Sequence, residues 1–77
     1  MREFNIVLRS LRQVQEFVSL AMIQPFDVLV GNDNHSINGK DLMGMFTLDY
    51  SNPVAVRVRC SQEQFTSFRT LAAQFLV

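Results

Sequence analysis

The chain has 77 residues, 48% of them hydrophobic, with seven phenylalanines, one cysteine and a formal net charge of zero at pH 7. We expect a single domain over residues 1–77, because this length and apolar fraction suit one compact core. The balanced charge disfavours nucleic-acid binding, which usually brings a basic excess. One cysteine allows no internal disulfide and fits a reducing cytoplasm, and no apolar run is long enough for a signal peptide or a membrane span.

The first third of the sequence predicts a strand and a helix. In residues 4–9 the apolar Phe4, Ile6 and Leu8 alternate with Asn5, Val7 and Arg9, the period of two that a half-buried strand shows. Ser10 and Gln13 have the spacing of a capping box and predict a helix over 11–23. Pro25 ends it, because the residue before a proline disfavours helical geometry. The apolar stripe of this helix is Leu11, Val14, Phe17, Val18 and Ala21.

The middle of the sequence predicts a hairpin followed by a short helix. Residues 26–30 alternate as a second strand, residues 31–34 are turn formers, and a short third strand over 35–38 pairs back. Asn38-Gly39 then turns the chain, and Asp41 is a suitable N-cap for a helix over 42–46.

The last third predicts a strand over 54–60 and a helix over 62–76. Val54, Val56, Val58 and Cys60 are in phase, so we expect Cys60 to be a buried, inert thiol. Ser61 and Gln64 fit a second capping box. The resulting order predicts an α+β fold, an open-faced sandwich whose four-stranded antiparallel sheet is covered on one face by helices.

Residues 40–48 read Lys-Asp-Leu-Met-Gly-Met-Phe-Thr-Leu. This segment resembles Lys-Ser-Ile-Met-Gly-Val-Met-Ser-Leu of HPr, the histidine phosphocarrier of the bacterial sugar phosphotransferase system. Five positions fall in register together, namely Lys40, Leu42, Met43, Gly44 and Leu48. The resemblance extends over nearly the whole chain and stops short only at the first loop. It implies the same HPr-like open-faced sandwich and a role connected with sugar transport.

HPr carries its phosphoryl group on the histidine of a Gly-Leu-His-Ala-Arg-Pro loop at the start of its first helix. The resemblance places Arg12 at the loop arginine and Ser10 at the histidine, and the glycine and proline are missing. It therefore implies a degenerate member that is not phosphorylated at the usual site. Ser10 is either a helix cap or a phosphate acceptor at a helix N-terminus. The only histidine, His35, is expected to be a solvated hairpin residue, because no arginine stands beside it to pair with phosphate.

Asp41 aligns with a serine that a dedicated kinase phosphorylates in many HPr proteins. Two interpretations stay open for this aspartate. It is a plain N-cap, or its permanent negative charge mimics the phosphorylated serine.

The short helix is also the predicted docking surface. We expect Met43, Met45 and Phe46 to be partly exposed together, with Lys40 and Asp41 as a polar rim and Arg12 nearby, because apolar surface on a small domain marks contact sites. The alternative is that these side chains close the core. Arg9, Arg12, Arg57 and Arg59 form either a basic patch or scattered solvated charges.

The leading functional hypothesis is a regulatory, protein-binding module that is not an enzyme and uses no cofactor or metal. Its partners would be enzymes of the phosphotransferase system or a transcription regulator, and not nucleic acid or a membrane. The first alternative is an active phosphocarrier that uses Ser10 or His35. An RNA-binding or ligand-sensing domain is a weaker alternative, because the 54–60 strand offers Arg57 and Arg59 without an aromatic ring for base stacking.

Overall fold

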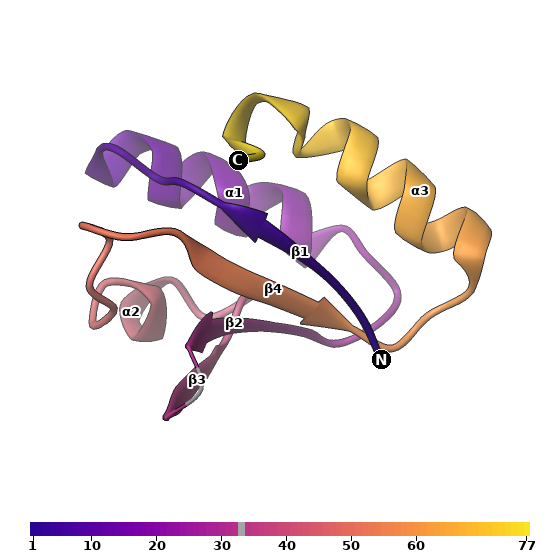
Figure 1. The fold of residues 1–77 in the computed structure, drawn as a ribbon, viewed down its shortest axis with the longest axis horizontal. Coiled ribbons are helices and arrows are strands. Elements are labelled where there is room, and N and C mark those ends of the chain that lie inside the picture. The colour runs from indigo at the N-terminus through magenta and orange to yellow at the C-terminus, as the bar shows by residue number, and fades with distance from the viewer. Residues whose placement is uncertain (33) are drawn as a thin grey trace.

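A computed structural model describes residues 1–32 and 34–77 of the chain. In this part of the chain one sheet of four strands is combined with three α-helices and a final 3₁₀ turn (Figure 1). In chain order the elements are β1 (Arg2–Ile6), α1 (Leu11–Met22), β2 (Val28–Asn32), β3 (His35–Asn38), α2 (Leu42–Met45), β4 (Val54–Val58), α3 (Gln62–Leu71) and the 3₁₀ helix η1 (Ala73–Phe75).

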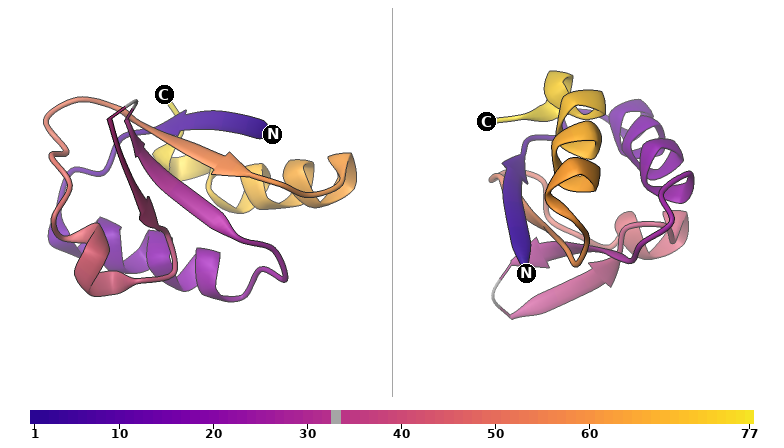
Figure 2. Two further views of the ribbon diagram at one scale, coloured as in Figure 1. Left: turned by 90° about the horizontal axis from the view of Figure 1, so that it is seen from below. Right: turned by 90° about the vertical axis from the view of Figure 1, so that its right-hand side faces the viewer.

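The sheet is antiparallel, with the strand order β1-β4-β2-β3. Strand β4 is central and pairs with both β1 and β2, so Val56 lies opposite Phe4 on one side and opposite Val30 on the other. Figure 2 shows all three helices on the same side of the twisted sheet, which leaves the other face uncovered. The predicted α+β open-faced sandwich is confirmed, and so is the central position of the strand predicted over 54–60, which the structure shortens to 54–58.

The core fills the space between the sheet and the helices. Strand β4 contributes Val54, Val56 and Val58, which are all buried as their alternation predicts. The helical layer contributes phenylalanine rings, and the ring of Phe68 lies 5.7 Å from that of Phe4 in an edge-on arrangement. Such edge-to-face ring pairs add to the stability that burial alone supplies.

Several predicted elements are shifted or shortened in the structure. The strands predicted over 4–9 and 26–30 are observed over 2–6 and 28–32. Leu8 and Phe26 are buried, as the alternation predicts, but they lie outside the segments that form the hydrogen-bonded ladders. The helix predicted over 11–23 ends at Met22, and the one predicted over 62–76 ends at Leu71. The 3₁₀ turn that follows α3 redirects the chain toward β1, where Val7 N donates to the Phe75 carbonyl at 2.8 Å.

Two side chains that were predicted to be buried are not fully buried. Leu11, placed on the buried stripe of the first helix, is 70% exposed, because it begins the helix beyond the edge of the core. Cys60, expected to be buried, is partly exposed, because β4 ends two residues before it.

The predicted turn over 31–34 includes Asp33, which lies outside the described residues. Gly31 and Asn32 belong to β2, and Gly31 pairs with Ser36 of β3. A Cβ atom on Gly31 would lie 1.9 Å from the carbonyl oxygen of His35, so the tight hairpin requires glycine there. No helix in the described ranges is both long and apolar enough to cross a bilayer.

Candidate functional site

The first helix begins at Ser10, whose extended backbone and side chain give it the N-cap role. The Ser10 Oγ accepts a hydrogen bond of 3.1 Å from the Gln13 main-chain N–H. The predicted capping box is incomplete, because the Gln13 side-chain oxygen accepts from Arg9 N at 2.6 Å instead of from Ser10 N. The Ser10 hydroxyl is therefore already engaged by the backbone of the helix that it caps.

A shallow groove of about 610 Å³ lies at this helix end. It is lined by Val7, Leu8, Arg9, Ser10, Leu11, Val14, Tyr50 and Ser51. The lining combines four apolar aliphatic side chains with the guanidinium of Arg9 and the hydroxyls of Ser10, Tyr50 and Ser51. Arg12 is exposed and bonds to no other described residue, but it is not one of the residues that line the groove. The structure thus places Arg12 two positions into the helix that begins at the groove.

Tyr50 connects this groove to the short helix α2. Its hydroxyl donates to the Met45 carbonyl at 2.5 Å, while its side chain lines the groove beside the start of α1. Burial raises the pKa of Tyr50 to about 12. The neighbouring Asp49 accepts hydrogen bonds from the Ser51 hydroxyl and from Ser51 N, and these bonds lower the pKa of the Asp49 carboxyl. The loop after α2 is therefore ordered by side-chain hydrogen bonds.

His35 lies apart from the groove lining. It begins strand β3, pairs with Asn32 and is exposed. The structure therefore does not bring the imidazole of His35 together with Ser10 in one pocket. The groove lining contains no imidazole side chain.

Lys40 and Asp41 precede α2, as predicted, but they interact in ways that the sequence did not indicate. The Lys40 ammonium donates to the Gln24 carbonyl at 2.8 Å, which ties it to the segment that follows α1. Asp41 occupies the N-cap position, and its side chain makes no capping hydrogen bond. Its carboxylate is exposed beside the first turn of α2, where the helix dipole favours negative charge.

Gly44 allows the Asp41 carboxylate to lie close to α2. A Cβ atom on Gly44 would be 2.7 Å from Asp41 Oδ2 and 2.9 Å from Ile37 Cγ2. Any larger residue would therefore push the carboxylate or Ile37 away. The glycine that aligns with the HPr segment thus serves close packing in this structure.

The predicted docking trio is not exposed together. Met45 is completely buried and belongs to the core, which corrects the expectation that it faces a partner. Met43 is 74% exposed and Phe46 is 37% exposed. A short helix presents one side to the sheet, and here that side carries Met45, while Met43 lies two residues earlier on the outer side.

The sequence analysis did not predict the groove, and Leu11 and Tyr50 are the clearest examples among its lining residues. Leu11 was assigned to the core, although a leucine directly after an N-cap precedes the first full turn that packs on the sheet. Tyr50 carries no local sequence signal that its hydroxyl reaches a helix carbonyl. In the described part of the chain no three histidine, cysteine, aspartate or glutamate side chains are close enough together to hold a metal ion.

Comparison with known proteins yields a structural similarity. No family model matches the sequence, and no curated protein matches it. Among solved structures, that of HPr-C-His from Thermoanaerobacter tengcongensis superimposes with a TM-score of 0.74 at 25% sequence identity, covering 96% of this chain and 93% of that one. Nearly the whole of both chains therefore shares one arrangement of sheet and helices, and the present chain has an HPr-like fold.

Proposed function

We propose that this chain is a protein-binding, regulatory module related to the bacterial sugar phosphotransferase system. In this proposal it works in the cytoplasm, is not an enzyme, and carries no phosphoryl group at the position of the HPr histidine. Its partner is a protein, either an enzyme of that system or a transcription regulator. The proposal rests on the HPr-like fold and on the similarity to an HPr structure.

The observation that carries the proposal is the identity of the residue at the N-terminus of α1. Ser10 stands there with its hydroxyl bonded to Gln13 N, and no imidazole lines the adjoining groove. A phosphoramidate on an imidazole nitrogen transfers its phosphoryl group readily, whereas a serine phosphate ester is far more stable. A phosphocarrier needs the phosphoramidate bond. We therefore propose that the present site serves recognition of a partner and not transfer of a phosphoryl group.

Two exposed apolar side chains, one in α2 and one directly after it, support docking of a protein. Met43 and Phe46 present flexible and aromatic surface, of the kind that protein contacts favour. Asp41 supplies negative charge at the rim, and Arg12 supplies an exposed guanidinium on the neighbouring helix. Lys40 contributes less, because its ammonium is held by the Gln24 carbonyl.

Asp41 is further proposed to mimic a phosphorylated serine. Its carboxylate is exposed and makes no capping hydrogen bond, so it is available to a partner's cations. If Asp41 serves only as a cap, Asp41→Asn would leave partner binding unchanged. If it acts as a phosphoserine mimic, the same substitution would weaken binding to a partner that recognises the phosphorylated state.

The labelling experiment uses phosphoenolpyruvate and the first enzyme of the phosphotransferase system. The unmutated protein should take up no phosphate, and Ser10→His should gain partial labelling, because a nucleophile then lies at the helix N-terminus close to Arg12. Ser36→His is the matched control, since Ser36 is an exposed serine of β3. Equal labelling of both variants would contradict the assignment of Ser10 to the histidine position.

The second candidate is a working phosphocarrier that uses Ser10 or His35. Both side chains are exposed, and that observation favours it. Strong labelling of the unmutated protein would establish this alternative. Ser10→Ala and His35→Gln would then identify the acceptor, because only one of them should abolish the label.

A further inference from the structure

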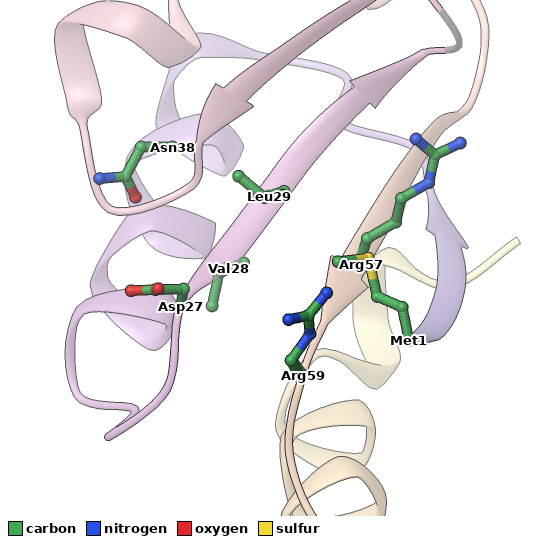
Figure 3. A pocket seen from close by; sticks show the side chains of 7 residues that line it. All are labelled: Met1, Asp27, Val28, Leu29, Asn38, Arg57 and Arg59. Atoms are coloured by element: carbon green, nitrogen blue, oxygen red, sulfur yellow. The ribbon is translucent and has the colours of Figure 1, made fainter.

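The uncovered face of the sheet contains a cleft that the proposed function does not use. Its volume is about 450 Å³, and it is lined by Met1, Asp27, Val28, Leu29, Asn38, Arg57 and Arg59 (Figure 3). These residues come from the ends of β2, β3 and β4 and from the first residue before β1. The cleft is within the range of volumes that small-molecule sites occupy.

Two opposite charges flank this cleft on neighbouring strands. Val28 pairs with Val58 at the end of the β2–β4 ladder, so Asp27, directly before β2, and Arg59, directly after β4, come next at this end of the sheet. Within the described part of the chain, neither side chain forms a hydrogen bond or an ion pair. Figure 3 shows the Asp27 carboxylate directed away from the Arg59 guanidinium. The cleft thus has a carboxylate, on Asp27, and a guanidinium, on Arg59, that do not pair with each other.

The other lining residues provide a fixed cation, apolar contact and a polar amide. Arg57 is held at the rim by its ion pair with Glu3, whose Oε1 lies 3.1 Å from Arg57 Nε. Leu29 and Met1 are 37% and 69% exposed and form the apolar part. Asn38 Oδ1 accepts from Lys40 N at 2.9 Å, which leaves the Asn38 amino group to donate.

This lining selects against several ligand classes. A polyanion such as nucleic acid would meet the Asp27 carboxylate, and none of the lining residues has an aromatic ring on which a base could stack. A purely apolar ligand would leave both charges unpaired and partly desolvated. A ligand that carries both charges and an aliphatic part satisfies every side of the cleft.

We propose that this cleft binds a free α-amino acid with a branched aliphatic side chain. The carboxylate of the ligand pairs with Arg59, its ammonium pairs with Asp27, and its side chain lies against Leu29 and Met1. The proposal is independent of docking through α2, because it concerns the face of the sheet that the helices do not cover (Figure 2).

The test is an NMR titration of the full chain with L-leucine, read on backbone amides. We expect saturable shifts at residues 27–29, 38 and 57–59 and smaller ones elsewhere. Two matched probes separate the charges: 4-methylpentanoate lacks the ammonium of leucine, and 3-methylbutan-1-amine lacks its carboxylate. Each should bind at least about tenfold more weakly than leucine, since each loses one charge-assisted contact.

Variants of exposed residues complete the test. Arg59→Gln and Asp27→Asn should each weaken leucine binding at least about tenfold, the change expected for loss of one such contact. Arg69→Gln and Glu16→Gln are matched controls on the helical layer and should leave it unchanged. Absence of a saturable shift with leucine would overturn the proposal. Equal binding of 4-methylpentanoate would also overturn it, because Asp27 would then have no role.

Discussion

The hydroxyl of Tyr50 donates a hydrogen bond of 2.5 Å to the main-chain carbonyl of Met45. This contact joins the loop after α2 to the helix residue that is most deeply buried, while the Tyr50 side chain also lines the groove at the start of α1. The groove at the start of α1 and the short helix α2 are therefore connected through one side chain. The stability of α2 and the shape of the groove should depend on each other.

Tyr50 should make the stability of the protein depend on pH in the alkaline range. Its pKa rises from 10.0 to about 12 on folding, so between these values the folded state holds a proton that the unfolded state has lost. The stabilisation that protonated Tyr50 gives the folded state is fully present below pH 10 and is lost as the pH rises through about 12. Because the chain has one tyrosine, titration of tyrosinate absorbance reports this group directly. Tyr50→Phe should abolish the dependence and cost about 0.5–1.5 kcal/mol at neutral pH. An absorbance midpoint near 10 would contradict the buried environment.

Met45 and Met43 should respond in opposite ways to the same substitution. Met45→Asp places an unpaired charge in the core and should cost several kcal/mol, enough to unfold so small a domain. Met43→Asp changes an exposed side chain and should alter stability by less than about 0.5 kcal/mol. Thermal melts followed by circular dichroism compare the two. Similar melting temperatures for both variants would show that Met45 is not core.

Met43→Asp should weaken binding to the partner although it leaves the stability of the domain nearly unchanged. In calorimetric titration with the first enzyme of the phosphotransferase system, Met43→Asp should weaken binding about tenfold or more if α2 is the docking surface. Thr70→Asp is a matched control, because it adds the same charge to an exposed position of α3. An equal loss of affinity in both variants would indicate a general effect of charge and not a docking site.

Ser10→Ala should destabilise the protein by about 0.5–2 kcal/mol, because Gln13 N loses its capping acceptor. Ser10→Asp should restore most of this loss, since a carboxylate also accepts from the first turn and is favoured by the helix dipole. Urea unfolding curves measure both. If Ser10→Ala is neutral, the hydroxyl is not a cap, and its availability to phosphate must be reconsidered.

Gly31→Ala should be among the most damaging small substitutions, at a cost of about 2 kcal/mol or more. The added methyl would meet the His35 carbonyl oxygen, a backbone atom that cannot move without opening the hairpin. Gly44→Ala is the informative comparison, because its nearest neighbour is the flexible Asp41 carboxylate, and alanine improves helix propensity by about 1 kcal/mol. Urea unfolding should therefore show a smaller loss at Gly44. Equal losses would indicate that Ile37 cannot adjust.

Much of the fold could be predicted from local patterns. Ser10, Pro25 and Ser61 mark helix boundaries through backbone chemistry that acts over a few residues, so the helix starts at residues 11 and 62 were predicted correctly. Strand β4 alternates between the core and the open face, and the valines at every second position, with Arg57 between two of them, identify the buried side. The order of these elements then restricts the possible sheet and its helical cover to few arrangements.

The candidate site was predictable only in part, because its decisive contacts join segments with no local signal. Residues 42–46 include apolar side chains on almost every side, so periodicity cannot distinguish Met45, which packs on the sheet, from Met43, which does not. Lys40 and Tyr50 each end in a polar group, and their partners, the carbonyls of Gln24 and Met45, lie in other segments of the chain. The sequence by itself determined which segments are helices and strands, since propensity, capping and alternation are local. Only the tertiary structure decided which side of α2 is buried and which open-face charges meet, because those depend on packing between segments distant in the chain.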